Sequence, residues 1–158
     1  MSDRTRAAIR VMFTSAVAIT ATLALAVSVA GSHTTVAQGT FQAFATGAAL
    51  DISGHAQMVR TADGKTIVSV HVEGLAPGTT YGSHVHKQAC ADGEADGHYR
   101  FDPFGPATPP NEIWPGFTTN AAGIGNGRAV VQGIAGSAAI SVVVHAPGGA
   151  KIACADLG

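Results

Sequence analysis

The sequence predicts a small all-β domain, either a sandwich or a barrel, on three observations. Glycine, alanine, threonine and valine dominate the chain after residue 30. Glycine and proline interrupt this region roughly every ten residues, a spacing typical of short strands joined by turns. Within residues 66–73, Val68, Val70 and Val72 alternate with Ile67 and more polar side chains, the period-two pattern of a half-buried strand.

The first half of the domain should contain an antiparallel hairpin. Residues 31–39 are predicted to be a disordered lead-in, and the fold is expected to begin at residues 41–50. Two further runs, at residues 56–61 and 66–73, flank a hairpin signal at residues 62–65. The two runs are therefore predicted to pair.

The second half combines strands with one long loop. A turn at residues 74–78 (GLAPG) leads into a strand at residues 80–86. Residues 87–116 hold most of the prolines and show no strand pattern; a loop of this length in a compact domain is usually functional. The later strands are expected at residues 128–132, 138–145 and 151–156, after a short run that a turn closes at residues 118–123.

The first thirty residues have the pattern of an export signal. Three arginines lie within the first ten positions, and residues 11–30 carry no charge and are rich in small residues. Residues 1–30 are therefore predicted to be a signal peptide whose end lies between residues 30 and 37, with the folded domain at 40–158. The protein would then be secreted, periplasmic or held in the cell envelope. An uncleaved membrane anchor is the alternative, because the apolar run is just long enough to span a bilayer.

The charge of the exported region argues against a nucleic-acid partner. Six of the nine lysines and arginines and nine of the ten acidic residues lie after residue 30. The formal net charge of this region is therefore about −3, whereas nucleic-acid-binding domains are basic. Both cysteines, Cys90 and Cys154, also lie in this region, where disulfides persist after export.

Four histidines carry most of the functional information. His84 and His86 flank one residue of a predicted strand, so both side chains can point to the same face. His98 follows in the long loop, and His145 ends a later strand. Two imidazoles on one wall, joined by two more from elsewhere, form a nitrogen-rich site that suits copper.

These residues, taken in order, resemble the copper–zinc superoxide dismutase family. The likeness covers roughly residues 40–158, and its motifs are ordered and widely spaced. The matching segments are Gly74-Leu75-Ala76-Pro77-Gly78, Gly82-Ser83-His84-Val85-His86, Cys90, Gly97-His98-Tyr99, Val144-His145, and the ending Ile152-Ala153-Cys154-Ala155-Asp156-Leu157-Gly158.

The resemblance implies an eight-stranded Greek-key β-barrel, an immunoglobulin-like sandwich in architecture, with copper held by four histidines. His84, His86 and His145 match ligands of copper alone, and His98 matches the imidazole that bridges copper and zinc. Cys90 and Cys154 match the family's intrachain disulfide. Lys151 stands where the family usually has an arginine beside the copper; it keeps the positive charge that guides anions but loses the planar fork of donors.

Two departures from the family point to its copper-only branch. No histidine lies between His98 and His145, so the further zinc ligands of the family are missing. Asp102, Asn111 and Glu112 are the remaining oxygen or amide candidates, a poor set for tetrahedral zinc. The charged loop of the family is also absent, because residues 146–150 lead almost directly to Lys151. We therefore expect a mononuclear copper site without zinc.

Without zinc, another group must orient His98. A carboxylate that accepts the second ring N–H would do so, and Glu112 is the first candidate, with Asp102 the second. His84, His86 and His145 lie on rigid strands, whereas His98 lies on a loop. His98 is therefore the ligand expected to release and carry a proton, which makes His98, Glu112 and Lys151 the candidate catalytic residues.

The preferred interpretation is an exported superoxide dismutase that converts superoxide to oxygen and hydrogen peroxide. An extracytoplasmic copper carrier that uses the same pocket without turnover is the alternative, and a structural barrel with a vestigial site is the third. Superoxide is then the small-molecule partner; no membrane partner is expected unless the signal stays uncleaved, and the oligomeric state is left open. His33 and His55 have no partner at ligand spacing, and His71 is expected at the surface.

Overall fold

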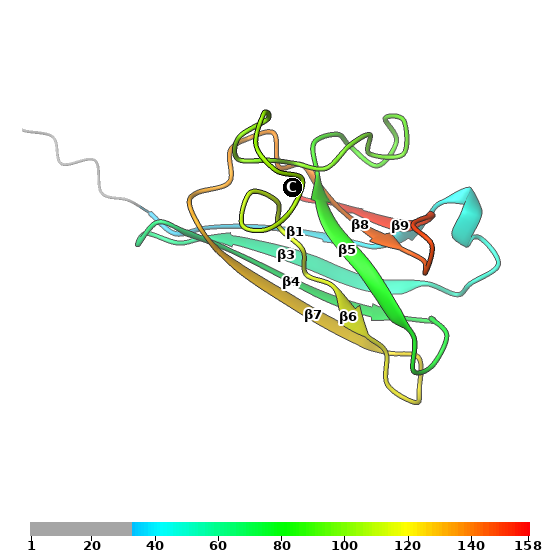
Figure 1. Ribbon diagram of the computed structural model, residues 1–158. Coiled ribbons are helices and arrows are strands. Elements are labelled where there is room, and N and C mark those ends of the chain that lie inside the picture. Colours follow the sequence, from blue (N-terminus) through cyan, green and yellow to red (C-terminus); the bar gives the residue numbers. More distant parts are fainter. Residues whose placement is uncertain (1–32) are drawn as a thin grey trace, which may run out of the picture. The chain divides into compact units, whose positions relative to one another are not determined.

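Residues 33–158 are the part of the chain that the structure, a computed structural model, describes (Figure 1). This part is all-β, as predicted, with a single 3-10 turn, η1 (Ala45–Gly47), and no α-helix. Its strands are β1 (Thr35–Thr40), β2 (Gln42–Ala43), β3 (Ser53–Arg60), β4 (Lys65–Glu73), β5 (Thr80–His86), β6 (Phe117–Thr118), β7 (Gly125–Gln132), β8 (Ser141–His145) and β9 (Lys151–Asp156).

The predicted signal peptide at residues 1–30 lies outside the described residues. Within the described part, no helix has the length and apolar character that crossing a membrane would require.

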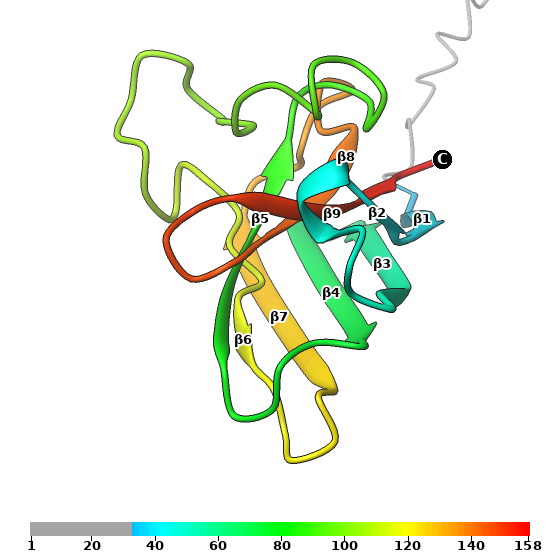
Figure 2. The same ribbon diagram turned by 90° about the vertical axis from the view of Figure 1, so that its right-hand side faces the viewer.

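The strands form two antiparallel sheets rather than a closed barrel. Their orders are β1-β3-β4-β7 and β2-β9-β8-β5-β6, and Figure 2 shows the two layers from the side. Buried side chains from both sheets, among them Met58, Val70 and Val142, join in one core cluster. Backbone hydrogen bonds between Gln38 and Gly158 join the sheets at one edge, but in residues 33–158 no strand of one sheet is paired in a ladder with a strand of the other. The sandwich prediction is therefore correct and the closed-barrel prediction is wrong.

The described residues contain nine strands, whereas eight were predicted. The chain leaves the first sheet at Phe41, where its backbone N–H donates to the Gly54 carbonyl, and joins the second sheet at once. The first strand is thereby divided into β1, paired with β3, and β2, paired with β9.

The predicted disordered lead-in is wrong for residues 35–39, because they belong to β1. This strand pairs with β3 from Thr35↔Arg60 to Thr40↔His55, so the domain begins before residue 40. Its side chains are small and mostly exposed, and its stability comes from the backbone ladder rather than from a buried face. Such a strand has no alternating apolar pattern that sequence reasoning could detect.

The predicted hairpin is confirmed as β3 and β4. All eight residues of β3 pair with β4, from Ser53↔Glu73 to Arg60↔Thr66. The predicted alternation in β4 also holds, because Val68, Val70 and Val72 are buried while the residues between them are half-buried. Burial of each valine contributes roughly 1.5–3 kcal/mol, which fixes the register of this sheet.

The central strands of the second sheet carry the elements of the site. Strands β5 and β9 have the predicted bounds, and β8 lies between them. The predicted strand at residues 138–145 is shorter than expected, because residues 137–138 form a turn that the Ala139 N–H closes on the Gly136 carbonyl. The loop at residues 87–116, green to yellow-green in Figure 2, lies beyond the end of β5.

Candidate metal centre

Two neighbouring strands place three histidines together. His84 and His86 are two residues apart on β5, so their side chains share one face of the strand. His145 ends β8, the strand next to β5, and lies opposite Gly82 in the register. His86 and His145 are buried, whereas His84 is half-buried.

The long loop supplies the fourth histidine. His98 forms an isolated bridge with His86, and the neighbouring Tyr99 N–H donates to the Val85 carbonyl at 2.8 Å. These backbone bonds hold the loop against β5 and turn the His98 ring toward the other three. One nitrogen from each ring lies within 4.8 Å of the nitrogens of the others, so the predicted set is brought together in one group that could hold a metal ion.

Hydrogen bonds outside the group fix which nitrogens face inward. Nδ1 of His86 donates to the Asp96 carbonyl at 3.1 Å, and Nδ1 of His145 donates to the Gly149 carbonyl at 3.0 Å. A carbonyl oxygen only accepts, so these Nδ1 atoms carry the protons and both Nε2 atoms are left with lone pairs. Nδ1 of His98 is held in the same way by a carboxylate of Glu112.

The inward atoms fit a bound cation. Nε2 of His86 and Nε2 of His145 lie 3.3 Å apart, with lone pairs directed at each other. Nδ1 of His84 is buried and has no hydrogen-bond partner among the described residues. Facing lone pairs and an unpaired buried nitrogen are both costly, and a metal ion would satisfy all of them.

The protonation of the group also favours metal binding. Burial, followed by the charges of His98 and His145, lowers the pKa of His84 to about 3. Burial and the same neighbours lower the pKa of His86 to about 4, and burial lowers the pKa of His145. These three rings are therefore neutral at pH 7, the form in which imidazole binds metals.

Glu112 lies at the centre of the network behind His98. Its side chain is 1% exposed, and Oε2 accepts hydrogen bonds from Nδ1 of His98 at 2.6 Å and from Nε1 of Trp114 at 2.8 Å. Oε1 accepts a bond from Nε of Arg100 at 3.0 Å. Burial alone would raise the pKa of Glu112, but these three hydrogen bonds outweigh burial and lower the pKa below its ordinary value.

Of the two carboxylates predicted to orient His98, one contacts its ring and the other does not. Glu112 makes the predicted contact, as described above. Asp102 does not, because its carboxylate accepts the backbone N–H of Phe104 and its backbone pairs with the side chain of Asn111. Asp102 therefore stabilises a turn within the loop.

Sequence reasoning missed two residues of this network, Arg100 and Trp114. Arg100 is two residues after His98, and Trp114 is two residues after Glu112. The two segments are joined by the Phe101 N–H to the Asn111 carbonyl, and the side chains of Arg100 and Trp114 both donate to the carboxylate of Glu112. The sequence shows no strand pattern in either segment, so neither residue could have been found without the structure. The Trp114 ring lies 5.1 Å from the His84 ring, measured between centroids.

The disulfide between Cys90 and Cys154 is confirmed. It joins residues 64 positions apart and ties the start of the long loop to β9. The Cys90 N–H also donates to the Asp156 carboxylate at 2.8 Å, which adds a second link between the same elements.

Lys151 lies near the histidines but is held by backbone. Its Nζ donates to the carbonyls of Glu94 and Asp96 at 2.7 and 2.8 Å. The charge of Lys151 contributes to lowering the pKa of His86 and of His145. Residues 94–96 all have positive φ angles, so the turn that accepts Lys151 also presents the Asp96 carbonyl to His86.

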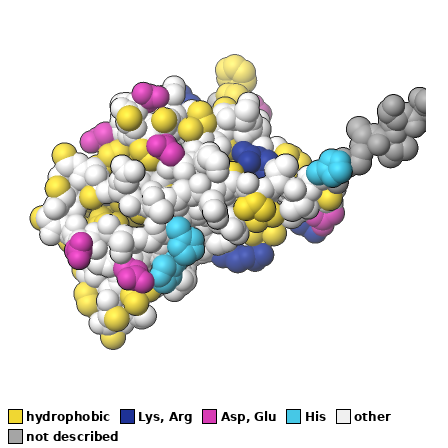
Figure 3. All heavy atoms as spheres, turned by 180° about the vertical axis from the view of Figure 1, so that it is seen from behind, with side chains coloured by type: hydrophobic (Ala, Val, Ile, Leu, Met, Phe, Trp, Pro, Cys, Tyr) yellow, Lys and Arg dark blue, Asp and Glu magenta, His cyan; other side chains and the backbone are white. Residues whose placement is uncertain are grey.

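The other described histidines lie away from the group. His33 and His55 are exposed and His71 is half-buried. His55 and His71 are neighbours on β3 and β4, and His71 accepts or donates hydrogen bonds only with Glu73 and Asn126. Figure 3, which views the molecule from behind, shows histidine and acidic side chains close together on that face. None of the three belongs to the four-histidine group, and His71, which was expected at the surface, is half-buried and bonded to Asn126 and Glu73.

Fold and site define an all-β sandwich with one disulfide and a four-histidine group able to bind a metal ion. No family model matches the chain, and no curated protein matches it.

Proposed function

We propose that this chain is an exported superoxide dismutase of the copper-only type, which converts superoxide to oxygen and hydrogen peroxide at a mononuclear copper site. The observation that carries the proposal is the convergence of four imidazole nitrogens within 4.8 Å, from two strands and a loop. The resemblance of the ordered motifs to the superoxide dismutase family supplies the reaction.

The donor set supports copper and a single ion. Imidazole nitrogens suit copper in both of its common oxidation states. Nδ1 of His98, the atom that would reach a second metal, is already bonded to Glu112, and Glu112 is saturated by Arg100 and Trp114. The other cluster of possible ligands among the described residues contains Cys90 and Cys154, whose sulfurs are joined in the disulfide.

The residues of the site have separate roles in metal binding and proton transfer. Bound copper would supply the electron transfer by alternating between Cu(II) and Cu(I). His84, His86 and His145 would hold the ion from the ends of β5 and β8. Each pair of superoxide ions needs two protons to yield hydrogen peroxide. His98 keeps its Nδ1 proton on Glu112, so its Nε2 is the atom that accepts and delivers a proton.

The connections support a Greek-key fold. Strands β1 and β2, counted as one strand bent at Phe41, bring the number to the eight of the family. The chain crosses between sheets from β4 to β5 and again from β7 to β8, as Greek-key connections do.

The experiment combines metal analysis with turnover. The protein is produced through an export pathway, loaded with copper and assayed for suppression of superoxide-driven dye reduction. We expect one copper per chain and suppression near the diffusion limit. His145→Gln should abolish both, whereas the matched control His55→Gln, at an exposed histidine, should change neither. Tight copper binding without suppression would contradict the enzyme and support the copper-carrier alternative.

A further inference from the structure

Arg100 is the cation beside His98 whose donors are not fully used. Its Nε donates to buried Glu112, which fixes the plane of the guanidinium group. Among residues 33–158, the terminal nitrogens Nη1 and Nη2 of Arg100 have no hydrogen-bond acceptor. Lys151, the cation expected to guide anions, instead donates to two backbone carbonyls. The free donors therefore lie on the Arg100 side of the site.

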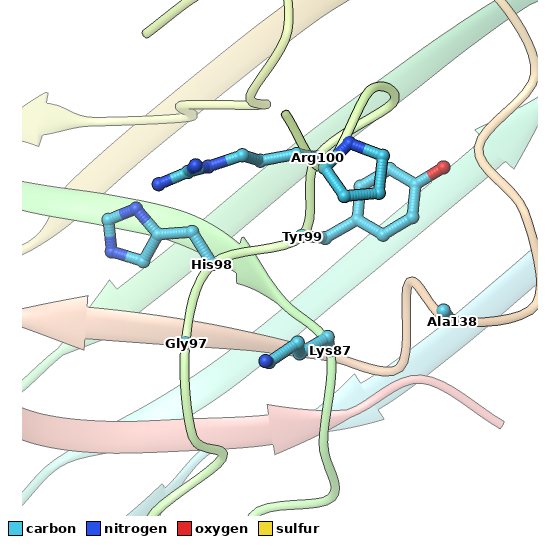
Figure 4. Close-up of a pocket in the computed structure, with 7 residues that line it drawn as sticks. Lys87, Gly97, His98, Tyr99, Arg100 and Ala138 are labelled. Carbon is cyan, nitrogen blue, oxygen red and sulfur yellow. The ribbon is translucent and has the colours of Figure 1, made fainter. Parts of the chain in front are cut away.

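Arg100 and His98 both line a pocket of about 360 Å³. Figure 4 shows the side chains of Arg100 and Lys87 on opposite sides of the His98 ring, all extending in the same direction. Apart from these groups, the walls are formed by Gly97, Tyr99, Pro103 and Ala138, so none of the lining residues is acidic. Lys87 is half exposed, and its ammonium group pairs with the carboxylate of Asp96 at 3.0 Å; Asp96 itself does not line the pocket.

We propose that Arg100, with Lys87 across the pocket, forms a docking site for a small oxyanion next to His98. If the proposed function holds, that anion is the substrate superoxide, and on this point the inference rests on the proposed function. Because Nε of Arg100 is anchored on Glu112, the outer edge of the guanidinium is held in place with its N–H groups directed away from the carboxylate. A guanidinium fixed on one edge by a carboxylate offers charged donors on its other edge, an arrangement that binds oxyanions well.

The test uses metal-free protein, so it does not depend on copper or turnover. Sodium sulfate is titrated at constant ionic strength, with sodium chloride as the balancing salt, and the Arg100 Nε–H resonance is followed by NMR. We expect a saturable shift in the wild type. Arg100→Lys should weaken sulfate binding about tenfold, the loss expected for one charge-assisted hydrogen bond, because a single ammonium is used by Glu112. In this variant the His98 and Trp114 side-chain resonances report binding.

Two lysine variants test whether a cation other than Arg100 accounts for sulfate binding. Lys65→Gln, at an exposed lysine paired with Asp63, should leave sulfate binding unchanged. Lys151→Gln should also retain it, because Lys151 is directed at backbone. The inference is overturned if the wild type shows no saturable shift, or if Lys151→Gln loses binding while Arg100→Lys keeps it.

Failure of the docking site and failure of the proposed function give different results. Saturable sulfate binding in a protein without turnover would support the anion site and contradict the enzyme. Turnover in a protein that shows no sulfate shift would overturn the docking site and leave the enzyme standing.

Discussion

Glu112 is the residue on which the geometry of the site most depends. It is buried and accepts hydrogen bonds from His98, Trp114 and Arg100, so its full negative charge is needed to satisfy three donors. Glu112→Gln would turn an amide N–H₂ toward one of these donors and leave it unpaired. We expect copper affinity to fall about 10–100-fold, as for other groups that orient metal ligands, measured by competition with a chelator of known affinity.

The control for this change is Asp102→Asn. Asp102 lies in the same loop but stabilises only the turn at Phe104. It should leave copper affinity unchanged. Equal affinity in the Glu112 variant and the wild type would contradict the orienting role of Glu112.

The acid sensitivity of the metal-free protein follows from the buried histidines. The pKa is lowered to about 3 for His84 and about 4 for His86, against 6.5 in the unfolded chain. Between these values the unfolded chain binds more protons than the folded one, so stability falls as pH falls from about 6.5 toward 4. For each ring, the free energy of unfolding should fall by about 1–2 kcal/mol between pH 7 and pH 5, with the lower figure for half-buried His84.

Urea unfolding at pH 7 and pH 5 measures this loss. The double variant His84→Gln/His86→Gln should show a flatter dependence on pH than the wild type. A wild type equally stable at both pH values would contradict the lowered pKa of these rings.

The site residues that could be predicted from the sequence are those with rare side-chain chemistry. Four histidines in a fixed order, two of them at strand spacing, already indicate a common site. Arg100 and Trp114 are ordinary loop residues in sequence, and their roles depend on the pairing of Phe101 with Asn111, which no local pattern encodes. Lys151 lies close enough to His86 and His145 for its charge to lower their pKa, but its bonds to the carbonyls of Glu94 and Asp96 depend on the backbone of the turn at residues 94–96.

Among the elements, the long loop depends on its covalent link to β9. The Cys90–Cys154 disulfide closes 64 residues of chain and fixes the turn that holds His86 and Lys151. On the chain-entropy estimate, its removal costs up to about 4 kcal/mol. Cys90→Ala/Cys154→Ala should therefore lower both the unfolding free energy and the copper affinity, measured by denaturant titration and chelator competition. An unchanged copper affinity would mean that backbone bonds alone hold the turn at residues 94–96 against His86.

The edge strand β1 limits where the proposed export signal can be removed without loss of stability. A cut after Ala37 would remove the first three residues of β1, whereas a cut after Ala30 leaves the strand whole. A chain starting at residue 38 should be less stable than one starting at residue 31 by about 1–3 kcal/mol, since each lost backbone hydrogen bond contributes about 0.5–1.5 kcal/mol. Thermal unfolding of the two chains measures the difference, and equal midpoints would contradict a stabilising role for residues 35–37.

A strand could be predicted from the sequence when one of its faces is buried. Strand β4 has one buried and one half-buried face, so its alternation was visible in the sequence. Strand β1 buries no residue fully and is placed by its pairing with β3 and by the approach of Gly39 to the Asp156 carbonyl, where a Cβ would lie only 1.8 Å away. Its partner strands are distant in sequence, so local reasoning could not find it.

For the whole molecule, metal binding should stabilise the fold without adding contacts between the sheets. The four histidines come from β5, β8 and the loop, so an ion bound by all of them links these elements in the folded state only. A ligand at one hundred times its Kd stabilises by about 2.7 kcal/mol, and the midpoint of thermal unfolding should rise accordingly with copper. His145→Gln should lose most of this rise, and His55→Gln should keep it. Because Glu112 occupies the outer nitrogen of His98, one equivalent should saturate the rise; a further increase with a second equivalent of copper or with added zinc would contradict a single-metal centre.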